Sequence, residues 1–225
     1  MGMGRRRDVA GGGRAVEVPV DRVAGWFTRF GDRHRGVTHT SLGADSVVCT
    51  ATDGATASVV VPFPPLSVVG EWDGLEVGPL LDHLAVSRRV GLVLVRLGGH
   101  SLGIAEQGRV LVSRTDRHLV HGRSAAGGWS QQRFARRREG QARHALEAAA
   151  RDIAEVLVPR VAELDAVVLG GDRQSLDVLR ADRGLAPVFD LAIDRVLDVP
   201  EPRRTVLEDA VERAFAVEIV VRDGP

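Results

Sequence analysis

The residues best suited to chemistry are two glycines followed closely by two glutamines. Residues 127–132 read Gly-Gly-Trp-Ser-Gln-Gln. Glycine permits backbone conformations and close approaches that a β-carbon forbids. The amide of Gln131 or Gln132 does not titrate and is no ordinary general base, but it can orient a water molecule while backbone N–H groups stabilise developing negative charge. Such a site suits an activated ester, for example the aminoacyl ester on the 3′ ribose of a tRNA.

Arginines surround this segment. The chain has 30 basic and 30 acidic residues, yet nine arginines and only two acids lie between Arg109 and Arg143. Arg114 precedes the glycines, and positions 133, 136 and 137 would share one side of a following helix. Arginines brought to the base of one loop would hold a nucleic-acid backbone. The candidate RNA-binding residues are Arg117, Arg123, Trp129, Arg133, Arg136, Arg137 and Arg138.

Trp129 admits two interpretations. It can stack on a base, as aromatic side chains commonly do with single-stranded RNA. It can equally pack against its own helix.

Composition removes several classes of protein. The sequence contains no lysine, so it cannot form the phosphate-binding loop that ends in Gly-Lys-Ser/Thr. Its single cysteine, Cys49, has no intrachain disulfide partner and is expected to be a small core residue. No apolar run reaches the length of a membrane helix, and no apolar stretch follows the arginines near the start, so we expect a cytoplasmic protein without a membrane partner. No cofactor-binding signature is present.

Three other chemistries are weighed and set aside. His118 and His121 could form a metal pair, but residues three apart in a strand face opposite sides, so no metal site is expected. Residues 170–172 resemble a nucleotide-binding turn but lack its glycine spacing, and Asp172 is expected to cap a helix. A two-metal nuclease needs converging carboxylates, which the runs Val90 to Leu97 and Arg109 to Ser113 do not contain.

In the first third of the chain, the sequence pattern predicts a disordered tail followed by a small folded unit. Residues 1–14 are rich in glycine and arginine and are expected to be disordered. Residues 15–75 predict a small α+β unit. Its helix, capped by Asp21, carries apolar residues at helical spacing, and two strands follow at Ser46 to Ala51 and Thr56 to Val61.

Residues 76–225 predict an α/β domain with a mixed sheet covered by helices. Short apolar runs punctuated by glycines indicate an antiparallel meander, and strands alternating with helices indicate βαβ crossovers. The expected strands are Val90 to Leu97, Ser101 to Glu106, Arg109 to Ser113, Asp116 to His121, Ala166 to Leu169, Phe189 to Val196 and Val217 to Val221. The expected helices are Gln132 to Val158, Asp172 to Ala181 and Arg203 to Ala214.

The central segment resembles a known family. The pattern Gly-Gly-x-Ser-Gln from Gly127 to Gln131, followed by Arg133-Phe134 and a basic helix, resembles the middle domain of eukaryotic and archaeal class I release factors. Their hallmark is a Gly-Gly-Gln loop. The sequence is more similar to the Vms-type peptidyl-tRNA hydrolases of ribosome quality control, specifically their actinobacterial release-factor-like branch, over residues 80–222. The resemblance implies a ribonuclease-H-like α/β fold.

The resemblance also implies a function. In that family the loop enters the peptidyl transferase centre, which would make Gly127 and Gly128 the flexible pair and Gln131 the catalytic residue. Because Trp129 and Ser130 separate the glycines from the glutamine, Gln132 remains an alternative. The expected protein is a monomeric peptidyl-tRNA hydrolase that needs no cofactor, binds the ribosomal large subunit and peptidyl-tRNA, and frees nascent chains from stalled ribosomes or large subunits.

Two other functions remain open. The same basic surface would serve a non-catalytic protein that binds tRNA or ribosomal RNA. Alternatively, the acidic carboxy-terminal part would dock a protein partner, as in an interaction module.

Overall fold

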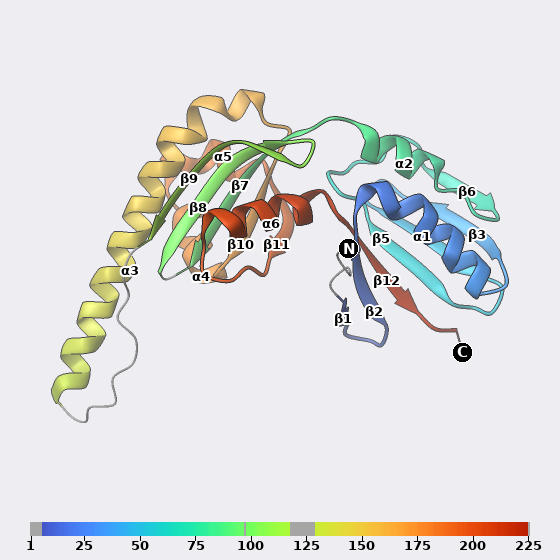
Figure 1. Cartoon of the computed structure of the whole chain (residues 1–225), viewed down its shortest axis with the longest axis horizontal. Coiled ribbons are helices and arrows are strands. Elements are labelled where there is room, and N and C mark those ends of the chain that lie inside the picture. The colour runs from blue at the N-terminus through green and yellow to red at the C-terminus, as the bar shows by residue number, and fades with distance from the viewer. Residues whose placement is uncertain (1–5, 97, 118–128, 225) are drawn as a thin grey trace. The chain divides into compact units, whose positions relative to one another are not determined.

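The computed structural model describes residues 6–96, 98–117 and 129–224, with only the backbone described at residues 6, 117 and 129–139 (Figure 1). The chain forms two compact units. Unit 1 comprises Met1–Val86 together with Phe215–Pro225, and unit 2 comprises Ser87–Ala214.

Unit 1 is built on an antiparallel sheet. Within the described residues the sheet has seven strands in the order β1-β2-β12-β5-β4-β3-β6. Its strands are β1 (Arg6–Asp8), β2 (Arg14–Val18), β3 (Val37–Leu42), β4 (Ser46–Ala51), β5 (Thr56–Val60), β6 (Gly70–Asp73) and β12 (Val217–Arg222), and its helices are α1 (Val20–Arg33) and α2 (Gly78–Ala85).

The core of unit 1 follows from strand alternation and helical spacing. In β4 every second side chain is buried, including Val47 and Cys49 at 0% exposure, which confirms Cys49 as a core residue. Of the apolar residues whose helical spacing predicted α1, Val23, Phe27 and Phe30 are buried, and Trp26 is partly buried against the same core. Asp21 is not the helix cap, because Pro19 occupies that position and its fixed φ suits a helix start. Asp21 lies in the first turn, where its charge is favoured by the helix dipole.

Unit 2 has the predicted mixed α/β architecture. Its described strands form a five-stranded sheet in the order β11-β10-β7-β8-β9, with β7, β8 and β9 antiparallel and β10 and β11 parallel to β7. The strands are β7 (Arg89–Arg96), β8 (Gly99–Glu106), β9 (Arg109–Arg117), β10 (Ala166–Gly171) and β11 (Ala192–Leu197). The helices are α3 (Trp129–Val156), η1 (Val158–Glu163), α4 (Arg173–Arg180), η2 (Arg183–Leu185), α5 (Ala186–Phe189) and α6 (Arg204–Phe215).

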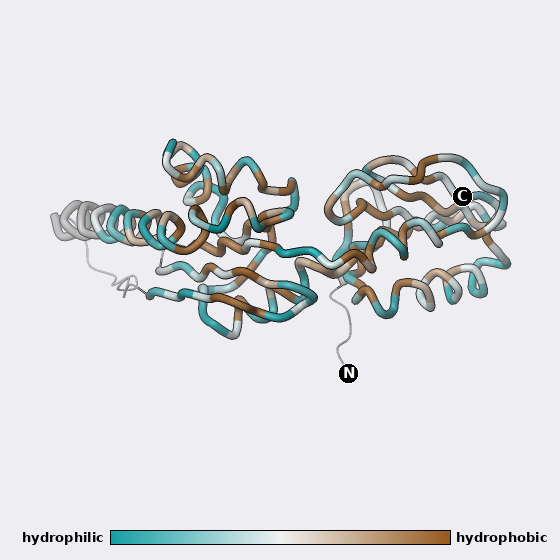
Figure 2. The backbone as a smooth tube through the Cα atoms, turned by 90° about the horizontal axis from the view of Figure 1, so that it is seen from above, coloured by the Kyte–Doolittle hydropathy of each residue, from teal (hydrophilic) through white to brown (hydrophobic). Residues whose placement is uncertain are grey.

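The sheet of unit 2 is covered on both faces. Val93 and Val95 of β7 belong to the core that α3, α4 and α5 complete. On the other face Gly103 of β8 leaves room for Leu207 of α6, whose Cδ2 would be 3.1 Å from an added β-carbon. Residues on both faces of β7 are therefore buried, and the strand is apolar from Val90 to Val95, between Arg89 and Arg96 at its ends. Figure 2 shows hydrophobic residues, in brown, along the strands of both units.

The last strand differs from expectation. Val217 to Val221 was expected to join the sheet of unit 2 through a βαβ crossover, but β12 pairs with β2 and β5 in unit 1. The alternating burial of Val217 and Ile219 suits any half-buried strand. Sequence periodicity identifies a strand but does not identify its partner.

The domain boundaries also differ from those expected for the tail (1–14), the small unit (15–75) and the larger domain (76–225). Part of the expected tail is ordered, since β1 pairs with β2. The boundary falls after Val86, because α2 packs in unit 1 through the fully buried Leu80. Residues 215–225 belong to unit 1.

Smaller differences lie at element ends. The strand expected from Phe189 begins at Ala192, because residues 186–189 form the short helix α5. The expected strands at Arg109 to Ser113 and from Asp116 onward form one strand through Arg117, and residues 118–121 lie outside the described residues.

Candidate functional site

Helix α3 carries most of the candidate site residues. It was expected to begin at Gln132, but it begins at Trp129, so Gln131 and Gln132 lie in its first turn. Residues 129–139 contain no glycine or proline and are rich in good helix formers, which explains the earlier start. Gly127, Gly128 and Arg123 lie outside the described residues.

The two ends of α3 have different surroundings. Among the described side chains of this helix, which begin at Gly140, the first buried one is Ala145. From there Ala148, Ala149 and Ile153 continue a buried stripe against β8 and β9. At ~1.5 Å of rise per residue, about 24 Å of helix precede Ala145. In Figure 1 the first turns of α3 extend beyond the end of the sheet.

The backbone of α3 therefore connects the candidate catalytic glutamines to the candidate RNA-binding arginines in one helix. Positions 131 and 132 are followed within two further turns by the candidate RNA-binding arginines. These arginines are Arg133, Arg136, Arg137 and Arg138, and the candidate Trp129 lies two residues before Gln131.

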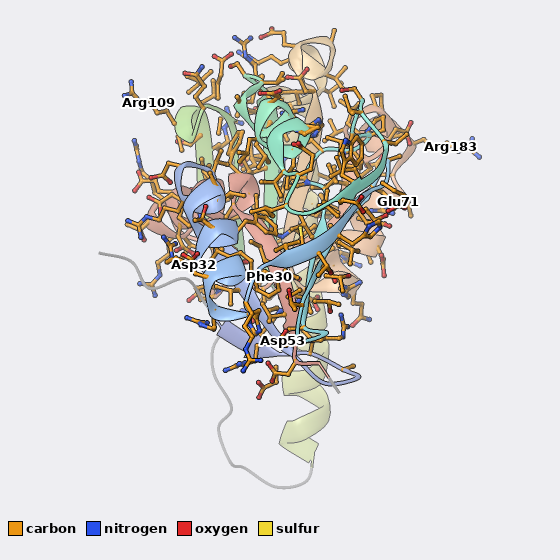
Figure 3. The ribbon with its side chains drawn as sticks, turned by 90° about the vertical axis from the view of Figure 1, so that its right-hand side faces the viewer. Phe30, Asp32, Asp53, Glu71, Arg109 and Arg183 are labelled. Atoms are coloured by element: carbon orange, nitrogen blue, oxygen red, sulfur yellow. The ribbon has the colours of Figure 1, made fainter. Side chains whose placement is uncertain are left out.

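The basic segment is not one patch. Arg109 and Arg117 lie at opposite ends of β9, roughly 26 Å apart at ~3.3 Å per residue. Arg109 is exposed and points outward (Figure 3). Arg117 ends β9 opposite Gly99 of β8. Of these two arginines, only Arg117 adjoins the segment that leads to Gly127.

Arg114 is engaged within the protein. Arg114 was expected to help hold a nucleic-acid backbone, but its Nη1 lies 2.9 Å from Oδ1 of Asp152 and 2.6 Å from Oε2 of Glu155. The hydrogen bonds that Arg114 donates to Glu155 and Asp152 hold its pKa above the ordinary value. Arg114 therefore attaches β9 to α3.

His100 of β8 completes this attachment, although it was not among the predicted site residues. Its Nε2 lies 2.8 Å from Oδ2 of Asp152, and its side chain is only 1% exposed. Partial burial acts to raise the pKa of Asp152, but the hydrogen bonds from His100 and Arg114 outweigh it and hold that pKa below its ordinary value. The signal in the sequence was Asp152 itself, a charged residue within the apolar stripe of a helix.

Asp172 has the predicted capping role. Its Oδ2 accepts hydrogen bonds from the hydroxyl of Ser175 at 2.6 Å and from the backbone N–H of Ser175 at 3.0 Å. The hydroxyl hydrogen bond has the largest effect in lowering the pKa of Asp172. This residue is a helix cap.

No metal-binding cluster of three or more His, Cys, Asp or Glu residues exists among the described residues. His118 and His121 lie outside them. None of the helices described in the structure combines the length and apolar character needed to cross a bilayer.

Comparison with known proteins identifies the family. Residues 88–220, more than half of the chain, match the model of the Actinobacteria/chloroflexi VLRF1 release factor. The chain belongs to this family of release factors. No curated protein sequence matches the chain.

Several solved structures are similar. An archaeal translation termination factor, aRF1, is 15% identical with a TM-score of 0.44, covering 74% of this chain and 48% of that one. This chain thus spans about half the length of the termination factor. A structure described as an archaeal protein is 13% identical with a TM-score of 0.39, covering 89% and 65%. Pelota from Archaeoglobus fulgidus is 12% identical with a TM-score of 0.30, covering 96% and 67%.

Proposed function

We propose that this release-factor family member is a peptidyl-tRNA hydrolase that frees nascent chains from stalled ribosomes or isolated large subunits. It acts as a cytoplasmic monomer, binds the large subunit and peptidyl-tRNA, and needs no cofactor. Gln131 is the proposed catalytic residue, with Gln132 as the alternative, and Gly127 and Gly128 are the proposed glycine pair of the site.

One observation carries this proposal: a single helix joins Gln131 to the core of unit 2. The buried half of α3 anchors it to the sheet, and its first turn, which begins at Trp129 after the two glycines, bears both glutamines. The intervening turns bear four arginines at positions 133 and 136–138. Such a helix can carry an uncharged amide along a path lined with RNA phosphates.

The chemistry fits an ester already activated by its ribose leaving group. The amide oxygen accepts a hydrogen bond from water and orients it toward the carbonyl carbon. The first N–H groups of a helix lack intrahelical acceptors, and the positive end of the helix dipole lies there. Both favour the negative charge that develops on the carbonyl oxygen during attack.

The strand order of unit 2 supports a ribonuclease-H-like fold. An antiparallel meander, β9-β8-β7, is extended by two parallel strands, β10 and β11, and helices cover both faces. We do not extend this likeness to nuclease chemistry, which requires a converging group of carboxylates.

The test uses purified ribosomes or large subunits that carry peptidyl-tRNA. We expect wild type to release the peptide, and Gln131→Ala to lose about 100-fold in rate, the size typical of removing one group that stabilises the transition state. The matched control is Gln141→Ala, the same substitution three turns later in α3, which should release peptide at the wild-type rate.

The outcomes separate the candidate functions. Loss of release in Gln132→Ala with normal release in Gln131→Ala would move the catalytic role to Gln132. Ribosome binding without peptide release by wild type would indicate a non-catalytic RNA-binding protein. Equal release by wild type and a Gln131→Ala/Gln132→Ala double variant would reject the mechanism.

A further inference from the structure

Four side chains form a polar clamp between α3 and the sheet of unit 2. The α3 clamp consists of His100, Arg114, Asp152 and Glu155. The two carboxylate oxygens of Asp152 bind different strands, since Oδ2 contacts Nε2 of His100 in β8 and Oδ1 contacts Nη1 of Arg114 in β9. Glu155, almost one turn later in α3, binds the same Nη1 of Arg114 at 2.6 Å.

Asp152 occupies a position where an apolar residue would be expected. It falls between Ala149 and Val156 on the buried stripe of α3, and its side chain is 19% exposed. Removing a carboxylate from water is costly, and an ion pair in such a place often contributes less to stability than an apolar side chain would. The best-attested use of such a pair is to specify one register between packed elements.

On the amino-terminal side of the clamp the buried side chains are small, whereas the fully buried Ile153 and the buried Val156 lie beside and after Asp152. Between Gly140 and Asp152, where the side chains of α3 are described, the buried residues are three alanines, at 145, 148 and 149, and Leu146 is partly buried against the same core. Alanine presents no long side chain to interlock with the sheet. A slip by one residue would move the helix about 1.5 Å and rotate it about 100°, which would separate Asp152 from both of its partners.

His100 fixes the direction of the contact. Its Nδ1 is buried and has no hydrogen-bond partner among the described residues, whereas Nε2 faces the carboxylate of Asp152. The tautomer that fits places the proton on Nε2, which donates to Oδ2. A side chain that replaces His100 must therefore present a donor at the Nε2 position.

The distance along α3 between the clamp and Gln131 makes the direction of the helix at the clamp important for the position of its first turn. Asp152 lies 21 residues after Gln131 on one continuous helix, which corresponds to about 32 Å. A tilt of about 10° at the clamp would move the first turn by about 5 Å, whereas a misplacement of ~1 Å can cost roughly 100-fold in rate.

We infer that the α3 clamp is a positioning element that fixes the direction in which α3 presents its first turn. The inference rests on the proposed function for its consequence in peptide release. Its physical content, a restricted direction of α3 relative to the sheet, is independent of that function.

Two matched variants of His100 test whether the donor must lie at the Nε2 position or whether any polar group at this site is sufficient. The side-chain amide of His100→Gln can reach the Nε2 position, but the shorter amide of His100→Asn reaches only the Nδ1 position. A third variant, Asp152→Leu, removes the contacts with His100 and with Arg114 that Asp152 makes, leaves the Arg114–Glu155 pair, and places an apolar side chain on the buried stripe.

The first measurement is the distance distribution between two spin labels in unit 2. The labels are placed at Glu139→Cys in α3 and at Val178→Cys in α4, where Val178 is 53% exposed, in a Cys49→Ala background. We expect a narrow distribution for the otherwise unchanged protein and for His100→Gln. We expect a distribution at least twice as wide for His100→Asn and Asp152→Leu, with unfolding midpoints still above the assay temperature.

The second measurement is peptide release. His100→Gln should stay within about 3-fold of wild type, whereas His100→Asn and Asp152→Leu should lose at least 10-fold in kcat with little change in KM, because phosphate contacts persist while the approach of the glutamine is misdirected. A purely structural role predicts instead that release follows stability across all three variants.

The results distinguish two failures. Equal distribution widths in all variants overturn the clamp, whatever the release rates. If wild type releases peptide, release that stays at the wild-type level in His100→Asn and Asp152→Leu overturns the role of the clamp in positioning the first turn. If the widths change as expected but neither wild type nor the Gln131→Ala/Gln132→Ala variant releases peptide, the proposed function fails and the clamp stands.

Discussion

Gly171 of β10 lies so close to Val95 of β7 that an added β-carbon would overlap the carbonyl oxygen of Val95. The φ angle of Gly171 is 102°, a conformation that side chains rarely adopt. The same carbonyl oxygen accepts the backbone N–H of Asp172 at 2.8 Å. This arrangement delivers Asp172 to the start of α4, where it caps the helix.

We therefore expect Gly171→Ala to destabilise unit 2 by at least about 2 kcal/mol, since it combines backbone strain with a clash against main chain. Urea unfolding monitored by circular dichroism measures the loss. A stability equal to that of wild type would show that the strand ends can separate without cost.

Gly140 is the opposite case. It lies inside α3, and a β-carbon there would meet nothing within 4 Å. Gly140→Ala should raise the free energy of unfolding by about 0.5–1 kcal/mol, because alanine loses less backbone entropy in a helix. Thermal unfolding tests this, and a lowered midpoint would contradict it. A straighter, stiffer α3 should also leave peptide release at or above the wild-type rate.

Ile219 lies in the middle of β12, the strand that pairs with both β2 and β5. It is fully buried and pairs with Val16 on one side and Val59 on the other. Ile219→Ala should lower the stability of unit 1 by about 2–5 kcal/mol through lost burial and a cavity. The control is Val60→Ala in the same sheet, where the 72% exposed side chain predicts a change within about 0.5 kcal/mol. Similar losses in both variants would contradict the placement of β12.

Cys49 should be inert in the folded protein. Burial raises the pKa of its thiol from 9.0 to about 11, and the hydroxyl of Thr40 lies 3.7 Å from its sulfur. At pH 8 the thiolate fraction is then roughly one in a thousand, so a thiol-reactive disulfide reagent should modify Cys49 only as fast as unit 1 opens. Rapid labelling in the absence of denaturant would contradict this.

The same shift has a consequence for stability at high pH. The folded state holds the thiol proton more tightly than the unfolded state. The contribution of Cys49 to the free energy of unfolding is therefore fully present below about pH 9 and is lost as pH rises toward about 11. Cys49→Ala should show a shallower decline in this range, measured by urea unfolding at each pH.

Ribosome association should depend steeply on salt. If Arg136 and Arg137 contact phosphate, Arg136→Glu/Arg137→Glu should reduce the slope of log affinity against log salt by about 2. The control is Arg173→Glu/Arg183→Glu, which makes the same charge change at exposed positions of α4 and η2 (Figure 3 labels Arg183). Cosedimentation at several salt concentrations gives the slopes, and equal slopes for the two variants would remove these arginines from the interface.

The sequence predicted elements wherever a local pattern was sufficient. The strand Ser46 to Ala51 has the expected bounds, because its β-branched and apolar residues favour a strand and every second one is buried. The cap at Asp172 was likewise predicted, since capping is local. The start of α3 was placed too late because Trp129 and Ser130 were interpreted as part of a glycine-bounded loop.

Contacts between elements far apart in the chain could not be predicted from the sequence. Val217 to Val221 was correctly predicted as a strand but assigned to the wrong sheet, because pairing depends on which open edge the strand meets. The contact of His100 with Asp152 joins residues 52 positions apart, and no spacing rule connects a strand residue to a helix residue over that distance.

The position of β12 has a consequence for how the protein is made. Synthesis proceeds from the amino terminus, so β2 and β5 leave the ribosome long before the strand that lies between them. Unit 2 is continuous from Ser87 to Ala214 and can complete its own core first. Until β12 is translated, the amino-terminal sheet is split into two parts with unpaired edges, and this is the stage at which a growing chain would be most prone to aggregate and most in need of a chaperone.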